Sequence, residues 1–417
     1  MFQQRPIGDL SVDLGRILDL YRQMKGLLLL LIFTSSLWAD EPASLPASTP
    51  WDLAALKAAP NFAWEDTSGK VSSLTYEGLS YKGKPTRVFA YYAHPKNFGV
   101  EGDVFPAMVL VHGGGGAAFE KWARLWAQRG YVAIAMDLAG KGADRKSLQD
   151  GGPDQGHEQK FATIDEPNEN QWSYHAVANV ILAHSLIRPF DEVDVDRVGI
   201  TGISWGGYLT CMVAGLDDRF SFAMPVYGCG FLQDNSCWKP SDFARMNDVQ
   251  RKKWHTLWDP SMYLASARMP VFFVNGSNDF AYPLDSHAKT CGLVRTEKNY
   301  SIQLAMAHGH IFDFPEFFLA ADQFLTGGVR LPVISKPLIE ENRVVASVSA
   351  VTPLAGARLH FTTGPHAENQ ARTWTTQELV IDGDRLTGAR PPDAATAWYV
   401  DVRDERKALI SSEVIIK

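Results

Sequence analysis

Near its centre the chain reads Val198-Gly199-Ile200-Thr201-Gly202-Ile203-Ser204-Trp205-Gly206-Gly207-Tyr208. This run predicts a short apolar strand, a Gly-x-Ser-x-Gly turn and the beginning of a helix. A serine on such a turn projects its hydroxyl from the sheet edge, and the next backbone N–H faces a developing oxyanion. Gly202 and Gly206 suit the turn, because it brings the strand and helix backbones close together. We therefore interpret Ser204 as a nucleophile, with an ordinary serine in a glycine-rich turn as the alternative.

Apolar strands and amphipathic helices alternate on both sides of this turn. Two segments with strand-like alternation, 72–80 and 87–93, come first and predict an antiparallel pair. Further strands are expected at 107–111, 131–136, 222–227, 270–274 and 301–306, and helices at 117–128, 171–187, 286–294 and 315–325. This alternation predicts an α/β fold with a mostly parallel sheet and helices on both faces. Ligands bind such sheets at the carboxyl ends of the strands.

The pattern changes after residue 328. Short β-rich runs separated by Gly, Pro and Asp turns fill 329–417, which predicts a small all-β sandwich domain of the fibronectin or immunoglobulin kind. No catalytic pattern occurs there, so we interpret it as a stabilising or spacer module, with carbohydrate binding as the alternative. The catalytic domain is then expected at 61–328 with an insertion at 228–264, and a Pro-rich linker at 40–60 precedes it.

Composition and net charge exclude some classes of binding partner. The chain has 417 residues, 46% of them hydrophobic, and a net charge of -7. That length supports a full core. No basic stripe is present to neutralise phosphates, which argues against nucleic acid or an anionic membrane surface as a partner. The oligomeric state is left open.

Residues 1–39 are interpreted as a signal region. Basic Lys25, the apolar run 27–33 and the small Ala39 before an acidic residue are typical of a secretory signal cleaved after Ala39. The apolar run is too short to span a membrane. Because residues 1–23 are too polar and too long for a usual n-region, we expect translation to begin at Met24; a long cytoplasmic n-region or a signal anchor is the alternative. The mature protein is expected to be secreted or periplasmic, without a membrane span.

Four cysteines occur, at Cys211, Cys229, Cys237 and Cys291. Export makes disulfides permissible. Cys229 and Cys237 flank a loop and are candidates for a bridge, although the sequence does not choose among the pairings. No pair has the spacing of a zinc site, and we expect no metal or other cofactor.

A serine nucleophile needs a histidine base, and that base needs a carboxylate to orient it. Asp279 follows the strand at 270–274 in a turn that can aim its carboxylate across the sheet. Two histidines, His308 and His310, follow the last strand. We favour His310 as the base, because it stands far enough past the strand to swing toward Ser204. His308 is then expected to be a supporting residue, and no third ligand accompanies the pair for a metal.

The oxyanion hole needs backbone donors already aimed at the carbonyl oxygen. Trp205 N–H is one candidate, and Gly113 and Gly114, after the strand at 107–111, supply the other. A phosphate-binding loop is the alternative for these glycines, but no Gly-Lys-Ser/Thr ending follows them. His112 is expected to brace the loop by hydrogen bonding.

Taken together, these motifs resemble the α/β-hydrolase superfamily over about residues 70–328. The chain is similar to its dienelactone hydrolase and acetyl xylan esterase branch, which implies cleavage of small acyl esters, often on sugars. The run from Gly202 to Tyr208 is also similar to prolyl oligopeptidases. Those enzymes carry a large β-propeller before the catalytic domain, and here only about thirty residues separate Ala39 from the first core strands.

Substrate contacts are predicted on the insertion at 228–264, which carries Trp238, Trp254 and Trp258 among charged residues. Such a wall suits a sugar face or a polar acyl ester; the alternative is that these side chains only anchor the insertion. The sequence therefore predicts a secreted serine esterase that deacetylates carbohydrate through Ser204, Asp279 and His310. A prolyl oligopeptidase-like peptidase and a non-catalytic binding protein with a hydrolase fold are the alternatives.

Overall fold

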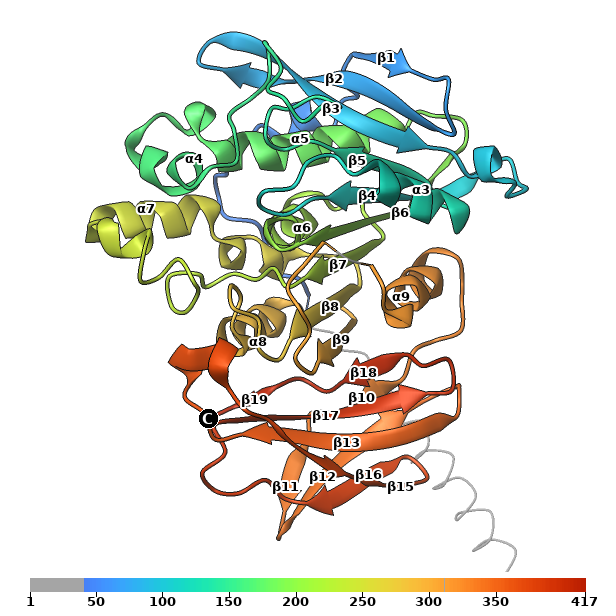
Figure 1. The fold of residues 1–417 in the computed structure, drawn as a ribbon, viewed down its shortest axis with the longest axis vertical. Helices are drawn as coiled ribbons and strands as arrows, with labels where there is room; N and C mark the ends of the chain where they lie inside the picture. Colours follow the sequence, from blue (N-terminus) through green and yellow to red (C-terminus); the bar gives the residue numbers. More distant parts are fainter. Residues whose placement is uncertain (1–40, 311) are drawn as a thin grey trace, which may run out of the picture. The chain divides into compact units, whose positions relative to one another are not determined.

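A mixed β-sheet runs through the part of the chain that the computed structural model describes, residues 41–310 and 312–417 (Figure 1). Its strands follow the order β1-β2-β3-β5-β4-β6-β7-β8-β9-β18-β17-β13-β14. The first strands are antiparallel: β1 (Phe62–Asp66), β2 (Val71–Tyr81) and β3 (Lys84–Ala93). The parallel part contains β4 (Phe105–Val111), β5 (Val132–Met136), β6 (Val193–Ile203), β7 (Phe222–Val226), β8 (Val271–Gly276) and β9 (Lys298–Gln303). The predicted antiparallel pair and the mostly parallel sheet of the catalytic part are confirmed.

Helices cover both faces of this sheet, as predicted (Figure 1). On one face lie α3 (Glu120–Gln128) and α9 (Pro315–Leu325), whose Trp126 and Phe318 rings are 5.2 Å apart. On the other face lie α5 (Trp172–Ile187) and α6 (Trp205–Leu216). Nearly all of α5 is buried, including a few polar side chains, because its apolar residues are spread around the whole helix. The other helices are α2 (Leu53–Leu56), α4 (His157–Phe161), α7 (Asp248–Trp258) and α8 (Leu284–Leu293), with 3-10 turns η1 (Pro95–Phe98), η2 (Ala162–Asp165), η3 (Asn168–Asn170), η4 (Phe243–Arg245), η5 (Pro260–Met262), η6 (Leu264–Ser266) and η7 (His366–Ala371).

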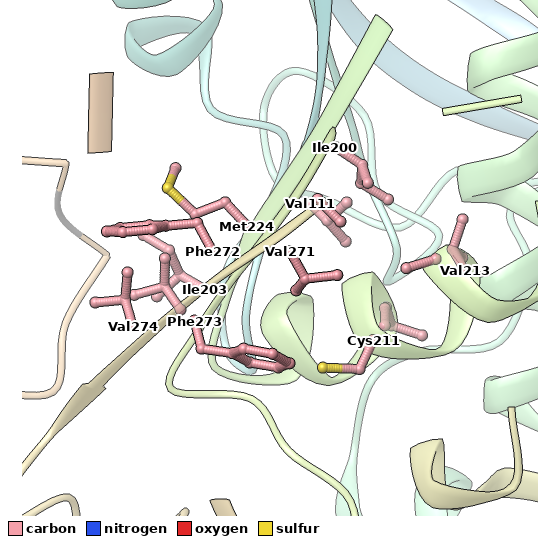
Figure 2. Packing of buried hydrophobic residues seen from close by; sticks show 14 of the residues in the cluster. Val111, Ile200, Ile203, Cys211, Val213, Met224, Val271, Phe272, Phe273 and Val274 are labelled. Carbon is pink, nitrogen blue, oxygen red and sulfur yellow. The ribbon is translucent and has the colours of Figure 1, made fainter. Parts of the chain in front are cut away.

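Packing in the core explains why the sequences of the central strands are unbroken apolar runs. Side chains alternate between the two faces of a strand, and Figure 2 shows Val271 and Phe273 of β8 directed toward α6, with Phe272 and Val274 on the opposite side. All four side chains are buried. A strand that is covered on both faces therefore needs apolar residues at every position. Cys211, on α6, packs in the same cluster.

The C-terminal strand region, residues 333–416, contains two sets of strands. One set extends the long sheet: β13 (Leu354–Thr362), β14 (Thr375–Glu378), β17 (Ala397–Asp404), β18 (Leu409–Ser411) and β19 (Ile415–Ile416). A second sheet holds β10 (Val333–Ile334), β11 (Leu338–Glu340), β12 (Arg343–Ser349), β15 (Val380–Asp382) and β16 (Arg385–Ala389). The two sheets agree with the predicted β-rich module. The structure adds a junction between β9 and β18, where Tyr300 pairs with Ser411.

The structure also bears on the predictions about the signal region, membrane spans and disulfides. The predicted signal region, 1–39, lies outside the described residues. Within the residues that the structure describes, every helix is too short or too polar to cross a membrane. All four cysteines are free, so the structure contains no bridge between Cys229 and Cys237.

Candidate active site

Ser204 lies at the sharp turn between β6 and α6. Its backbone is strained, with φ 62° and ψ -120°, and its N–H donates to Val226 O at 2.9 Å. The flanking glycines are sterically required. A methyl group placed on Gly206 would lie 2.0 Å from Val111 O, and one on Gly202 would lie 2.4 Å from Gly206 O. The turn therefore has the geometry that the Gly-x-Ser-x-Gly pattern predicted.

His308 connects Ser204 to a carboxylate. Its Nε2 lies 2.9 Å from Ser204 Oγ, and its Nδ1 lies 2.6 Å from Asp279 Oδ2. Asp279 is buried, and its Oδ1 accepts hydrogen bonds from the N–H groups of Ala281 and Tyr282 at 2.9 and 2.8 Å. The carboxylate is thus fixed, and a proton on Nδ1 leaves Nε2 as the acceptor for the serine hydroxyl.

The preference for His310 as the base is corrected by this geometry. His310 Nε2 instead accepts a hydrogen bond from Gly113 N–H at 3.1 Å. The loop after β9 is held one residue before His308, where Tyr227 O–H donates to Ala307 O at 2.9 Å. The Tyr227 ring also stacks on His308 at 4.4 Å. Loop reach alone was therefore the wrong criterion, because contacts with distant residues, among them Tyr227 just after β7, hold His308 facing the serine.

The glycine loop after β4 lies against Ser204, as the sequence predicted. A methyl group on Gly113 would lie 2.9 Å from Ser204 Cβ, and one on Gly114 would lie 2.8 Å from Trp205 Cδ1. Trp205 begins α6, where the first N–H groups have no partner within the helix. Gly113 N–H is already bonded to His310, so Gly114 and Trp205 are the better candidates for donors to an oxyanion.

Two neutral histidines brace this loop. His112 Nδ1 lies 2.8 Å from Gly113 O, and its Nε2 accepts from Leu138 N–H at 2.9 Å. Burial lowers the pKa of His112 to about 4 and that of His310 to about 4. Both rings are therefore neutral near pH 7, which suits nitrogens that accept a backbone N–H. His112 has the bracing contacts that were expected of it.

The insertion tryptophans do not form an open wall. Trp238, Trp254 and Trp258 are only 6%, 1% and 0% exposed. Trp254 Nε1 donates to Lys160 O and Trp258 Nε1 donates to Gln171 Oε1. Trp238 packs 4.6 Å from the Trp205 ring. The prediction that they contact substrate is corrected, because they anchor the insertion onto the catalytic part.

Lys160, on α4, is a group that the sequence reading missed. Its Nζ lies 4.7 Å from the centre of the Trp205 ring and 5.3 Å from that of Trp172. The residue is 6% exposed, and burial lowers the pKa of its amine to about 7, with Asp154 and Asp242 opposing the shift. No sequence signal marks it, because it falls in a polar segment that reads as a loop.

A pocket of about 470 Å³ opens beside His308. Phe280 and Ala307 line it from the catalytic part, and Gln370, Arg372 and Trp374 line it from the C-terminal strand region. Within the described residues no group of three or more His, Cys, Asp or Glu side chains is placed to hold a metal ion.

Comparison with known proteins agrees with this architecture. Residues 52–259 match the model of the acetyl xylan esterase (AXE1) family. An acetyl xylan esterase from a Paenibacillus species is 18% identical, with a TM-score of 0.52, over 70% of this chain and 99% of that chain. Acetyl xylan esterase 1 from a Thermoanaerobacterium species is 19% identical, with a TM-score of 0.52, over 69% of this chain and 96% of that one.

A third relative points to a different reaction class. A probable dipeptidyl-peptidase 5 from Emericella nidulans is 26% identical over 158 residues, which are 36% of this chain. The match spans 20% of that relative's length. The family match includes Ser204 but ends before Asp279 and His308. The contact between Asp279 and His308 therefore comes from the structure alone.

Proposed function

Because this chain belongs to the α/β-hydrolase superfamily and matches the acetyl xylan esterase family over residues 52–259, we propose that it is a serine esterase. It removes small acyl groups, acetyl above all, from carbohydrate through an acyl-enzyme on Ser204. His308 is the base and Asp279 orients it. The observation that carries this proposal is the hydrogen-bonded series from Asp279 through His308 to Ser204.

Side chains and backbone groups of the chain supply every proton transfer and hydrogen bond that the proposed reaction needs. His308 Nε2 takes the Ser204 proton as Oγ bonds to the ester carbonyl carbon, and the oxyanion accepts from Trp205 and Gly114 N–H. When the carbon–oxygen ester bond breaks, the alcohol leaves with the proton from His308. Water, deprotonated by the same nitrogen, then attacks the acyl-enzyme, and His308 returns that proton to Ser204 Oγ as the acyl–Oγ bond breaks and the acid leaves.

The surroundings of the serine favour a small acyl group. Ser204 is 8% exposed. The Trp205 ring next to it packs against Phe161 at 5.8 Å as well as against Trp238. The glycine loop also lies close, because a methyl group on Gly113 would be 2.9 Å from Ser204 Cβ, so a bulky acyl group has little room beside the serine.

Export to the periplasm or the medium is part of the proposal, and it rests on the signal region at 1–39. A peptidase is the second candidate, because the relative that matches over 158 residues is described as a probable dipeptidyl-peptidase. A non-catalytic binding protein is the third, and the completed hydrogen-bonded series argues against it.

A substrate panel separates these three candidates. The purified chain is incubated with p-nitrophenyl acetate, acetylated xylan and Pro-containing dipeptide amides. We expect release from both acetyl esters and none from the amides, with activity lost in Ser204→Ala and retained in the exposed Ser68→Ala control. Amide cleavage alone would favour the peptidase, and acetyl release that survives Ser204→Ala would refute the mechanism.

A further inference from the structure

The C-terminal strand region is attached directly to the loop that carries the triad carboxylate. Asn278 Nδ2 donates to the backbone oxygens of Gln370 and Arg372 at 3.2 and 2.7 Å. In the opposite direction, Asn369 Nδ2 donates to Asp279 O at 2.9 Å. Asn369 is 4% exposed, so its bond to Asp279 is an interior contact, whereas the bonds of Asn278 lie nearer the surface. This segment is therefore fixed beside the Asp279 loop, and its Gln370 and Arg372 line the pocket that His308 also lines.

Arg372 holds this segment in shape. Its Nη1 donates to Asn369 Oδ1 at 3.1 Å, and its Nε donates to Pro365 O at 3.1 Å. The side chain is 5% exposed. A buried guanidinium is costly unless its donors are bonded, so the segment is built to keep one conformation.

The pocket between this segment and His308 has the features of a sugar site. Phe280 is 47% exposed and lies edge-on to the His308 ring at 4.9 Å. Gln370, from the other side, is exposed and offers an amide donor and acceptor. An apolar ring face beside a few placed polar groups is the usual composition of a site for a small polar ligand.

The reaction decides which part of the substrate lies here. The alcohol oxygen takes its proton from His308 Nε2, so the alcohol must lie along the His308 ring. His308 is among the residues that line the pocket, and its ring contacts Phe280, which also lines it. We propose that Phe280 and Gln370 bind the sugar that leaves as the alcohol, so that the C-terminal strand region supplies half of the leaving-group subsite. This inference rests on the proposed esterase function.

The test compares a sugar ester with an ester that has no sugar. Phe280→Ala and Gln370→Ala are assayed with acetylated xylotetraose and with p-nitrophenyl acetate. We expect the ratio of kcat/KM for the sugar ester to kcat/KM for p-nitrophenyl acetate to fall at least about fivefold, mainly through KM of the sugar ester. Gln128→Ala, an exposed glutamine at the end of α3, is the matched control and should keep the ratio of the unaltered chain.

Measuring the binding of a sugar directly tests the subsite without any catalytic turnover. Xylotetraose is titrated into full-length Ser204→Ala, with and without Gln370→Ala. We expect saturable binding that Gln370→Ala weakens at least about threefold. Absence of binding, or an unchanged ratio in both subsite variants, would overturn the inference. Loss of p-nitrophenyl acetate hydrolysis in Ser204→Ala would still support the proposed serine mechanism, so the two failures are distinguishable.

Discussion

Two loops meet at Ser204, and different parts of the chain hold them. The glycine loop around Gly113 is braced from within the catalytic part, by His112 and His310. The carboxylate loop around Asp279 is bonded to Asn369, 90 residues further along the chain. The contacts that brace the glycine loop thus come from within the catalytic part, whereas the carboxylate loop is also bonded to the C-terminal strand region. We therefore expect a module without any catalytic pattern in its sequence to help position Asp279.

The largest loss of activity is expected when His308, the proposed base, is replaced. His308→Ala should lower kcat for p-nitrophenyl acetate by about a thousandfold or more, because it removes the group that accepts the Ser204 proton. His310→Ala should lower kcat by less than about tenfold, because it removes only a brace of the glycine loop. Steady-state kinetics of both variants measure the difference. Equal losses, or the reverse order, would contradict the assignment of His308.

An intermediate effect is expected from the contact that crosses to the C-terminal strand region. Asn369→Ala leaves the N–H groups of Ala281 and Tyr282 on Asp279 but removes the bond to its backbone oxygen, together with the bond that Asn369 accepts from Arg372. We expect kcat to fall by about tenfold and the free energy of unfolding to fall by about 1–3 kcal/mol, the usual cost of a lost buried hydrogen bond. Urea unfolding and p-nitrophenyl acetate kinetics provide the two measurements.

Asn97→Ala is the control for that variant. Asn97 Nδ2 also donates to a backbone oxygen, that of Lys70 at 3.1 Å, but the residue is exposed and far along the chain from the triad loops. Both kcat and stability should stay close to those of the unaltered chain. If Asn97→Ala and Asn369→Ala behaved alike, the carboxylate loop would not depend on the C-terminal strand region.

The smallest effect is expected at Lys160, on the glycine-loop side of the site, and it depends on pH. Burial lowers the pKa of Lys160 to about 7, so the unfolded chain, with a lysine pKa of about 10.4, binds this proton more tightly. The penalty for the buried charge is complete below pH 7 and is relieved as the pH rises toward 10.4. Lys160→Met should therefore raise the free energy of unfolding by about 2 kcal/mol at pH 6 and by much less at pH 10.

Urea titrations at the two pH values test this prediction, with the exposed Lys121→Met as the control. The charged and titratable groups that face Lys160 include Asp154, Asp242 and His112, and they are unchanged in both variants. A stabilisation that is the same at pH 6 and pH 10 would show that the buried charge of Lys160 is not its cause.

The sequence was sufficient for the sheet and for two of the three residues in the hydrogen-bonded series. Buried parallel strands need continuous apolar runs, and a strand-to-helix turn around Ser204 needs glycines, so both leave a local signal. Asp279 was placed by chain order and by its position after β8. These features depend on residues close together in the chain.

The remaining features depend on contacts between distant residues. His308 and His310 have the same local pattern, and only their contacts with distant residues distinguish them: Asp279 and Tyr227 for His308, and Gly113 for His310. The insertion tryptophans fit a substrate wall and an anchor equally well until their burial is known. Asn369 and Gln370 carry no motif, because their role follows from where β13 and β14 place the segment between them.

Labelling with a fluorophosphonate tests the central claim most directly. The unaltered chain is treated with the reagent, digested, and the modified peptide is sequenced by mass spectrometry. The account predicts one adduct per chain, on Ser204, and strongly slowed labelling in His308→Ala but not in His310→Ala. An adduct at another residue, or ester hydrolysis by a chain that the reagent leaves unmodified, would contradict it.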